Sequence, residues 1–413
     1  MMVYPNKNHF INGCETRLKI TKVEVFRLPT ANSKQNSPIG CRIHTDVGIC
    51  GDGEAGMAYG VGGSGAFGMV CDLAELIIGM DPLRTEFIWE TMYKRTFWGQ
   101  NGGPVVFSGI AAIDVALWDI KGKYFNVPCY QLLGGKVRDK LRTYASQLQF
   151  GWGQVGVSEH LWAVTPADYA HNVKLALDEG FDAIKIDFFD RDEEGKPLNF
   201  LDTTGLLTPK QLKMVESRMK AAREAAGDDV DIIMENHSYP DALGAVQLAK
   251  LAEKYNIMAF EEPNTPTTQT VEYIAKYSSV PIANGERLYS RWQYAEYFKK
   301  NLLQLAQPDI GNCGGITEVK KISDMAHAYD VGIQVHCAGS PLTTNAALHL
   351  ECTLPNFLIH EHHTCNRMDT SVGLTKYNLQ PENGYFTVPD LPGIGNEFLQ
   401  EAIDRATLYK VIE

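Results

Sequence analysis

The sequence lacks the long apolar runs that a membrane protein needs. No stretch of its 413 residues is apolar for long enough to span a bilayer, and residues 1–16 lack the apolar segment of a secretory signal peptide. Positive charge is also scarce, since 38 Lys and Arg residues face 50 Asp and Glu residues, for a formal net charge of −12. We therefore expect a cytoplasmic protein that binds neither nucleic acid nor a membrane. An anionic substrate would need a positive charge placed locally at its binding site.

Paired cysteines and a phosphate loop are absent as well. The nine cysteines are an odd number and none forms a C-x-x-C pair, so reduced thiols are expected. The glycine-rich segment 60–65, GVGGSG, lacks the Gly-Lys-Ser/Thr ending of a phosphate loop and does not follow a βαβ pattern. It is predicted to be a mobile loop. The length predicts one large domain together with a smaller one.

Two successive patterns of secondary structure divide the chain. Residues 18–28, 39–45 and 51–59 alternate as antiparallel strands do, and helical patterns follow at 66–78, 84–93 and 107–124. From about residue 141, strands alternate with helices; the candidate strands are 141–146, 183–188, 232–237, 258–262, 281–286, 303–309, 332–336 and 357–362. Short connections imply parallel strands and favour a closed TIM-type α/β barrel, with an open doubly wound sheet as the alternative.

Three segments outside these elements are informative. Residues 97–103, FWGQNGG, are aromatic and glycine-rich, which suits a loop that closes over a ligand. Residues 190–208 form a long polar insertion after the second barrel strand, and such loops are uncommon unless they have a function. The irregular stretch 365–413 is expected to return to the N-terminal part of the chain.

Ionisable residues stand at the ends of the predicted barrel strands, where TIM barrels carry their chemistry. They are Lys185, Asp187, Glu235, His237, Glu261, Glu262, Glu286, Asp309, His336 and Glu361. Any one of them taken alone is more simply explained as a buried salt bridge or a capping carboxylate. Together they indicate a site, because converging charges are costly without a counter-ion.

Three of these carboxylates, Glu235, Glu261 and Glu286, come from adjacent strands. They would repel one another unless a cation lies between them. An all-oxygen ligand set favours a hard ion, Mg²⁺, over zinc, which prefers His and Cys. Lys185 either places a positive charge near a substrate oxygen or, if its pKa is lowered, acts as a base.

Two histidines flank this predicted metal site. Asp309 and His336 end neighbouring strands, and a carboxylate on one imidazole nitrogen orients the ring as a base. His237 shares a strand face with Glu235, two residues away, so it is predicted to point into the same mouth. This arrangement suits abstraction of a proton α to a carboxylate, with the cation stabilising the enediolate that forms.

These residues resemble the enolase superfamily, in particular the acid-sugar dehydratases of its mandelate racemase subgroup. The resemblance extends over most of the chain, in the motifs AIDVALWDIKGK at 112–123, LLGG at 132–135, FEEP at 260–263, GERLYSR at 285–291, QPD at 307–309 and CGGIT at 313–317. It implies an α+β capping domain of residues 1–135, completed by about 365–413, and a (β/α)₇β barrel of residues 136–364. It also implies Mg²⁺, a sugar-acid substrate and a homo-oligomer.

The resemblance also implies a role for each residue of the site. Glu235, Glu261 and Glu286 match the metal ligands, and His336 with Asp309 matches the base that takes the C2 proton. His237 matches the acid that helps the 3-hydroxyl leave, and Glu361 matches a carboxyl that contacts the substrate carboxylate or enediolate. An aldonate such as galactonate or a related hexonate would then lose water and become a 2-keto-3-deoxy acid.

Two departures from the family pattern keep alternatives open. The first ligand is usually Asp, and Glu235 is one methylene longer. The Lys-x-Lys pair of the racemases is here Lys185-Ile186-Asp187, so one base is missing, and Asp187 either binds substrate hydroxyls or pairs with Lys185. A racemase or epimerase, and a catalytically silent sugar-acid-binding relative, are the alternative functions.

Overall fold

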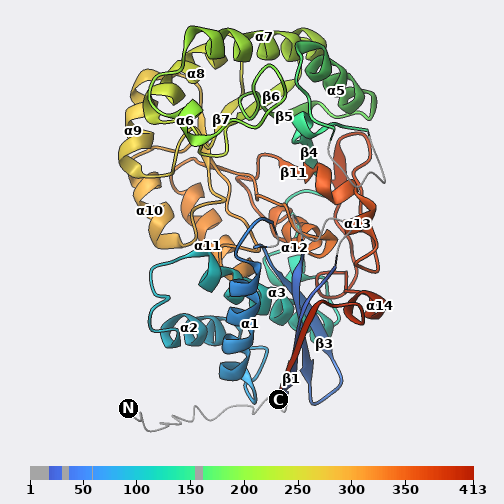
Figure 1. The fold of residues 1–413 in the computed structure, drawn as a ribbon. Helices are drawn as coiled ribbons and strands as arrows, with labels where there is room; N and C mark the ends of the chain where they lie inside the picture. The colour runs from blue at the N-terminus through green and yellow to red at the C-terminus, as the bar shows by residue number, and fades with distance from the viewer. Residues whose placement is uncertain (1–17, 30–36, 58, 154–160) are drawn as a thin grey trace.

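A four-stranded antiparallel sheet anchors the N-terminal region. In the computed structural model, which describes residues 18–29, 37–57, 59–153 and 161–413, its order is β13-β1-β2-β3. The strands are β1 (Ile20–Arg27), β2 (Ile39–Thr45), β3 (Cys50–Ala55) and β13 (Leu408–Ile412). Because β13 pairs with β1, the C-terminal end of the chain completes the N-terminal sheet, as Figure 1 shows in red beside blue.

Helices α1 (Gly63–Ile77) and α3 (Pro104–Phe125) pack on this sheet, and α2 (Thr85–Arg95) packs against these two helices. Helix α3 approaches β3 closely because Gly51 and Gly53 have no side chain; a Cβ on either would lie 2.1 Å or 1.8 Å from a carbonyl oxygen of α3. The expectation of a loop over 60–65 is wrong in its second half. Gly62, at φ +117, is the N-cap of α1, and the helix begins at Gly63.

A curled sheet of mainly parallel strands forms the second part of the molecule. Its order is β10-β9-β8-β7-β6-β5-β4-β11, with β12 (Tyr385–Thr387) added antiparallel to β4. The parallel strands are β4 (Lys140–Ser146), β5 (Ala183–Asp187), β6 (Asp231–Glu235), β7 (Ala259–Glu261), β8 (Ile282–Asn284), β9 (Leu305–Ala306), β10 (Gly332–Ile333) and β11 (His360–His363). A parallel bridge between Ile333 and Phe357 joins β10 to the chain that leads into β11, which closes the ring.

Helices connect successive strands of this ring and surround it (Figure 1). They are α5 (Pro166–Asp178), α7 (Pro209–Ala226), α8 (Ala242–Lys254), α9 (Thr268–Tyr277), α10 (Arg291–Lys299), α11 (Gly315–His327) and α12 (Pro341–Glu351). The short helices are α4 (Cys129–Leu132), α6 (Phe200–Thr203), α13 (Asp369–Val372) and α14 (Gln400–Ile403). The predicted α/β barrel with an α+β capping unit is confirmed, and the open sheet is ruled out because the ring closes.

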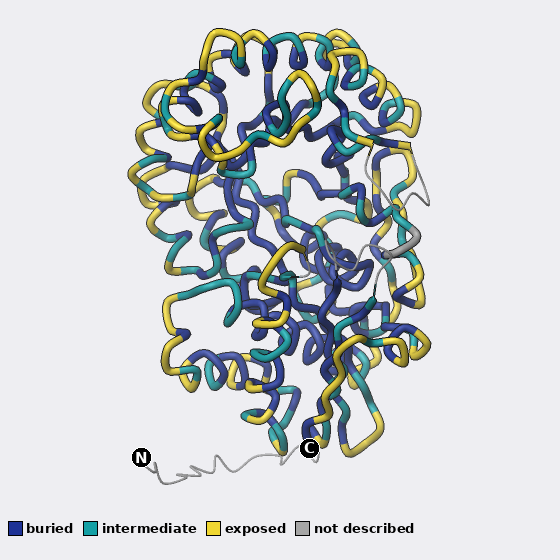
Figure 2. Tube along the Cα trace, viewed as in Figure 1, coloured by how far each residue is buried: buried dark blue, intermediate teal, exposed yellow. Residues whose placement is uncertain are grey.

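The buried core lies inside the ring, between the ring and its helices, and between sheet and helices in the capping unit (Figure 2). The two units are joined by buried polar contacts. Glu54 at the end of β3 accepts hydrogen bonds from the backbone nitrogen of Ser340 at 3.1 Å and from Thr343 Oγ1 at 2.8 Å. Both partners follow His336, so the capping sheet is tied to the mouth of the barrel. Within the described part of the chain, no helix has the length and apolar character to cross a bilayer.

Candidate active site

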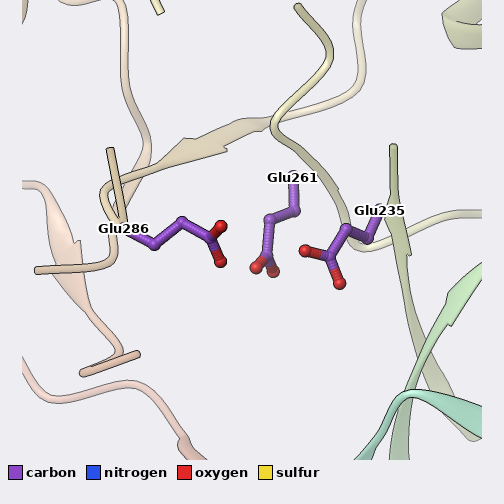
Figure 3. A group of neighbouring side chains, drawn as sticks. All are labelled: Glu235, Glu261 and Glu286. Carbon is purple, nitrogen blue, oxygen red and sulfur yellow. The ribbon is translucent and has the colours of Figure 1, made fainter. Parts of the chain in front are cut away.

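Three glutamates meet in the mouth of the barrel, each at or just beyond the carboxyl end of its strand. Glu235 ends β6, Glu261 ends β7 and Glu286 follows β8 by two residues. Each offers an oxygen that lies within 4.8 Å of the others, and their carboxylates point toward one another (Figure 3). Among the described residues this is a group that could hold a metal ion.

The donors of this cluster fit a cation. Glu235 Oε1 and Glu261 Oε2 are buried and have no hydrogen-bond partner. Such orphaned carboxylate oxygens are costly to bury, and a bound cation would satisfy them. Burial and the neighbouring charge of Glu235 also raise the pKa of Glu261 to about 8, although Lys185 opposes the shift. The cluster therefore carries more negative charge than the protein alone balances.

Lys185 lies beneath the cluster and is fully buried. Its Nζ is 2.6 Å from Glu261 Oε1, 2.8 Å from Glu361 Oε1 and 3.2 Å from Glu235 Oε2. Burial by itself lowers the pKa of Lys185, but these carboxylates outweigh burial and raise it well above its ordinary value. These ion pairs favour the alternative in which Lys185 places a positive charge at the site over the one in which it acts as a base.

Glu361, at the end of the ring on β11, is also fully buried. Besides Lys185, it accepts hydrogen bonds from Ser146 Oγ at 2.7 Å and from the backbone nitrogen of Cys337 at 3.0 Å. Burial raises the pKa of Glu361, but the charges of Lys185 and His336 hold it well below its ordinary value. It is an ionised carboxylate whose oxygens already have donors.

His336 and Asp309 form the pair that the sequence predicts. Their strands adjoin through a parallel bridge at these residues, and Nδ1 of His336 is 2.5 Å from Asp309 Oδ2. The opposite nitrogen, Nε2, faces the cluster at 3.0 Å from Glu286 Oε2. Burial lowers the pKa of His336, but Glu286 and Glu361 raise it well above its ordinary value.

His237 stands at the other end of the cluster, with Nε2 at 3.3 Å from Glu235 Oε1. The prediction that strand alternation directs His237 into the mouth is wrong, because β6 ends at Glu235 and His237 has φ +46. A left-handed turn, continued by Ser238 at φ +62, directs the imidazole into the mouth instead. The prediction that His237 and His336 lie on opposite sides of the carboxylates agrees with these contacts.

Asp187 forms a hydrogen bond with His237 and does not pair with Lys185. Its Oδ2 lies 2.8 Å from Nδ1 of His237, and its Oδ1 accepts a hydrogen bond from the backbone nitrogen of Phe189 at 2.7 Å. It is buried and does not contact Lys185 through a hydrogen bond. Burial lowers the pKa of His237, but Glu235 and the bond to Asp187 raise it to about 10.

The site also contains residues that the sequence argument missed. Gln147, just past the end of β4, donates from Nε2 to Glu235 Oε2 at 2.6 Å. Arg287 pairs with both Glu262 and Glu286. Gln147 could have been predicted from its position directly after a barrel strand. Arg287 could not, because its contacts depend on side-chain directions that the spacing of residues does not encode.

A cavity of about 500 Å³ opens above the cluster, and both units line it. Met57 and Pro104 belong to the capping unit, while residues that follow β4, β5 and β6 form the opposite wall. That wall includes Trp162, Asp190 and Arg191. The polar insertion at 190–208 therefore contributes to the cavity. The ionisable residues at the strand ends lie at the floor of the cavity.

Comparison with known families assigns this architecture. The model of the "Enolase C-terminal domain-like" family matches residues 168–402. The model of the "Mandelate racemase / muconate lactonizing enzyme, N-terminal domain" matches residues 16–134. The chain therefore belongs to the mandelate racemase/muconate lactonizing enzyme family of the enolase superfamily, which confirms the resemblance seen in the sequence.

Individual relatives match over nearly the whole chain. A D-galactonate dehydratase of Ralstonia pickettii is 34% identical over 388 residues, which cover 92% of this chain and 91% of the relative. A D-galactonate dehydratase of Cronobacter sakazakii is 33% identical and covers 94% of each. The crystal structure of an enolase-superfamily member from Salmonella Typhimurium is 45% identical, with a TM-score of 0.92, and covers 96% of this chain and 100% of that one. By this relationship the chain is an enzyme of the dehydratase class.

Proposed function

We propose that this protein is a Mg²⁺-dependent dehydratase of a sugar acid, an aldonate such as galactonate or a related hexonate. The product would be the 2-keto-3-deoxy acid. One observation carries the proposal: two imidazoles, each bonded to an aspartate through Nδ1, face the three-carboxylate cluster from opposite ends through Nε2. Elimination of water needs one base and one acid on a substrate held between them.

Glu235, Glu261 and Glu286 would hold the cation, because their oxygens converge and two of them have no hydrogen-bond partner. Oxygen donors of this kind select a hard divalent ion. When bound, Mg²⁺ supplies the positive charge that stabilises negative charge on the substrate carboxylate as the α-proton leaves. Lys185 adds a second fixed positive charge below the same carboxylates.

His336 takes the C2 proton on Nε2, while Asp309 keeps Nδ1 occupied and so fixes the direction of the ring. His237 then gives the proton on its Nε2 to the 3-hydroxyl as the C3–O bond breaks, and water leaves. The enol product becomes the 2-keto acid by moving a proton to C3. Asp187 holds the His237 ring toward the cavity throughout.

A screen of purified protein against a library of aldonates and aldarates tests this proposal, with semicarbazide detection of α-keto acid, in Mg²⁺ and in EDTA. We expect keto acid from at least one sugar acid, and none in EDTA. A library that yields no keto acid under any condition would overturn the proposal.

The variant His336→Asn separates dehydration from its alternatives. It should abolish both keto-acid formation and exchange of the C2 proton with deuterium, because the base is lost. If wild-type protein exchanged C2 deuterium and changed the configuration at C2 without forming keto acid, racemisation would replace dehydration as the function.

A further inference from the structure

One oxygen of a largely buried carboxylate in the wall of the cavity lacks a hydrogen-bond partner. Asp190 lines the cavity, and its side chain is only 15% exposed. Its Oδ1 has no hydrogen-bond partner, and its Oδ2 comes no nearer to a positive charge than 3.8 Å from Nε of Arg191. Burial, followed by the charge of Asp187, raises the pKa of Asp190 to about 7. Natural proteins rarely keep such a group without a use for it.

Arg191 stands beside this carboxylate and is held in place. Its guanidinium carbon lies 3.5 Å above the ring of Trp162, and one of its amino groups donates to the carbonyl oxygen of Gly195 at 2.7 Å. Nε, the atom nearest to Asp190, has no hydrogen-bond partner. The pair therefore leaves one acceptor and one donor unpaired just beneath the cavity wall, and both side chains contribute to its lining.

The backbone of this wall is fixed from behind by Arg218, which is almost fully buried on α7. Arg218 donates to the carbonyl oxygens of Phe188 at 3.0 Å and Arg191 at 2.8 Å. These bonds hold the chain on both sides of Asp190. The wall is consequently a preformed surface that faces the cavity, which is what recognition of a ligand requires.

Asp190 belongs to the same side of the cavity as His237. The charges of His237 and of Asp187, its hydrogen-bond partner, both act on Asp190. If C2 of a sugar acid lies at His336 and its 3-hydroxyl at His237, as proposed above, the carbons beyond C3 would extend toward the wall that contains Asp190 and Arg191.

The charges of the lining distinguish two kinds of sugar acid. Among the described residues of the cavity wall, the side chains with a permanent positive charge are Arg191 and Arg287. Arg287 is committed to Glu262 and Glu286, and Arg191 has Asp190 at its free nitrogen. A second carboxylate would meet Asp190 with no free cation to pair with, whereas hydroxyl groups can donate to Asp190 and accept from Arg191.

We propose that Asp190, together with Arg191, is the specificity-determining pair that binds the hydroxyls beyond C3 of a monocarboxylic sugar acid and rejects dicarboxylic ones. The proposal rests on the proposed dehydratase function and deepens it. It assigns the substrate to the aldonates and excludes the aldarates, and it gives the insertion after β5 a direct role in choosing the substrate.

The test compares kcat/KM for an aldonate and for the aldarate of the same configuration, in wild-type protein and in Asp190→Asn. We expect wild type to favour the aldonate by at least 100-fold. Asp190→Asn should raise KM for the aldonate by about tenfold or more, with little change in kcat. It should also lower the ratio of kcat/KM for the aldonate to kcat/KM for the aldarate. Glu193→Gln is the matched control, because Glu193 lies in the same insertion but pairs at the surface with Lys210.

Binding measurements make the test independent of turnover. Calorimetric titration of His336→Asn, with and without Asp190→Asn, gives Kd for each acid in the presence of Mg²⁺. An aldarate used or bound as well as the aldonate, or a preference unchanged by Asp190→Asn, would overturn the inference while leaving the dehydratase proposal intact. If no acid is turned over, the dehydratase proposal fails. The Kd values of the aldonate and the aldarate, compared with and without Asp190→Asn, then decide whether Asp190 selects monocarboxylic acids.

Discussion

At the scale of single residues, the site is built from two aspartate–histidine pairs. Asp309 holds His336 and Asp187 holds His237, and in each pair the bond is to Nδ1, so that Nε2 faces the carboxylates. In the proposed function, the Asp187–His237 pair takes the place of the second lysine of the racemases. A fixed acid opposite a fixed base suits elimination better than the inversion of one carbon.

Replacing Asp187 by Asn tests whether this second pair serves the acid step. The neutral amide would still bond to His237 but would no longer stabilise its protonated form, so we expect kcat to fall about 100-fold with little change in KM. Exchange of the C2 proton with deuterium should persist, because His336 and Asp309 are untouched. Asp309→Asn provides the contrast, since it should slow exchange and dehydration together. Equal loss of both reactions in Asp187→Asn would contradict the assignment.

At the scale of elements, the capping helix α3 is docked to the start of α11 through one aspartate. Asp114 accepts hydrogen bonds from the backbone nitrogen of Thr317 at 2.9 Å and from its Oγ1 at 2.5 Å. Trp118, one turn along α3, donates to the same hydroxyl at 2.9 Å. Gly315 makes this docking possible, because a Cβ there would lie 2.4 Å from Asp114 Oδ2.

Gly315→Ala should therefore weaken the joint between the two units. The residue has φ +82, so the substitution adds backbone strain to the clash with Asp114. We expect the free energy of unfolding to fall by about 2–4 kcal/mol in urea titration. Gly205→Ala is the control, since Gly205 has φ +75 but nothing within 4 Å of a Cβ, and it should lose only about 1–2 kcal/mol. Equal losses would show that strain alone matters.

Helix α12 gives the fold a dependence on pH. Its His349 is fully buried and stacks on Tyr130 of α4, with ring centroids 5.7 Å apart. Burial lowers the pKa of His349 to about 4, from an ordinary value of 6.5. As the pH falls below 6.5, His349 binds a proton in the unfolded chain but stays neutral in the folded one. The contribution of neutral His349 to the free energy of unfolding is therefore complete above pH 6.5 and is lost as the pH falls toward 4.

This loss should amount to roughly 3 kcal/mol between pH 7 and pH 4. Urea titration at several pH values measures it. In His349→Gln the corresponding part of the pH dependence should disappear, even if the variant is less stable at pH 7 because the stacking is lost. If the pH profile of His349→Gln ran parallel to that of wild type, the protonation of His349 would contribute nothing to the pH dependence of the free energy of unfolding.

At the scale of the whole molecule, the sequence predicts the architecture well and the contacts of the site less well. The ends of the later strands recur every 23–27 residues and each carries an ionisable group, so the barrel and its mouth follow from spacing alone. Spacing does not predict three features of the site: the left-handed turn at His237, the hydrogen bond between Asp187 and His237, and the carboxylates around Lys185. They depend on how side chains from different strands meet, which periodicity does not encode.

The cation links the site to the stability of the whole molecule. A ligand that binds only the folded state stabilises it by RT ln(1 + [L]/Kd), which is about 2.7 kcal/mol at a concentration 100 times Kd. The three glutamates come from strands distant in sequence, so the unfolded chain has no equivalent site. We therefore expect Mg²⁺ to raise the midpoint of thermal unfolding, and EDTA to reverse the effect.

Glu261→Gln distinguishes binding at the cluster from binding elsewhere. The variant removes one donor charge, and it also relieves the repulsion that raises the pKa of Glu261 to about 8. It should therefore unfold no more easily than wild type in EDTA but should gain little from Mg²⁺. Glu272→Gln, at a surface pair with Lys300, should respond to Mg²⁺ as wild type does. A Mg²⁺ response retained in Glu261→Gln, measured by differential scanning calorimetry, would place the cation outside the barrel mouth.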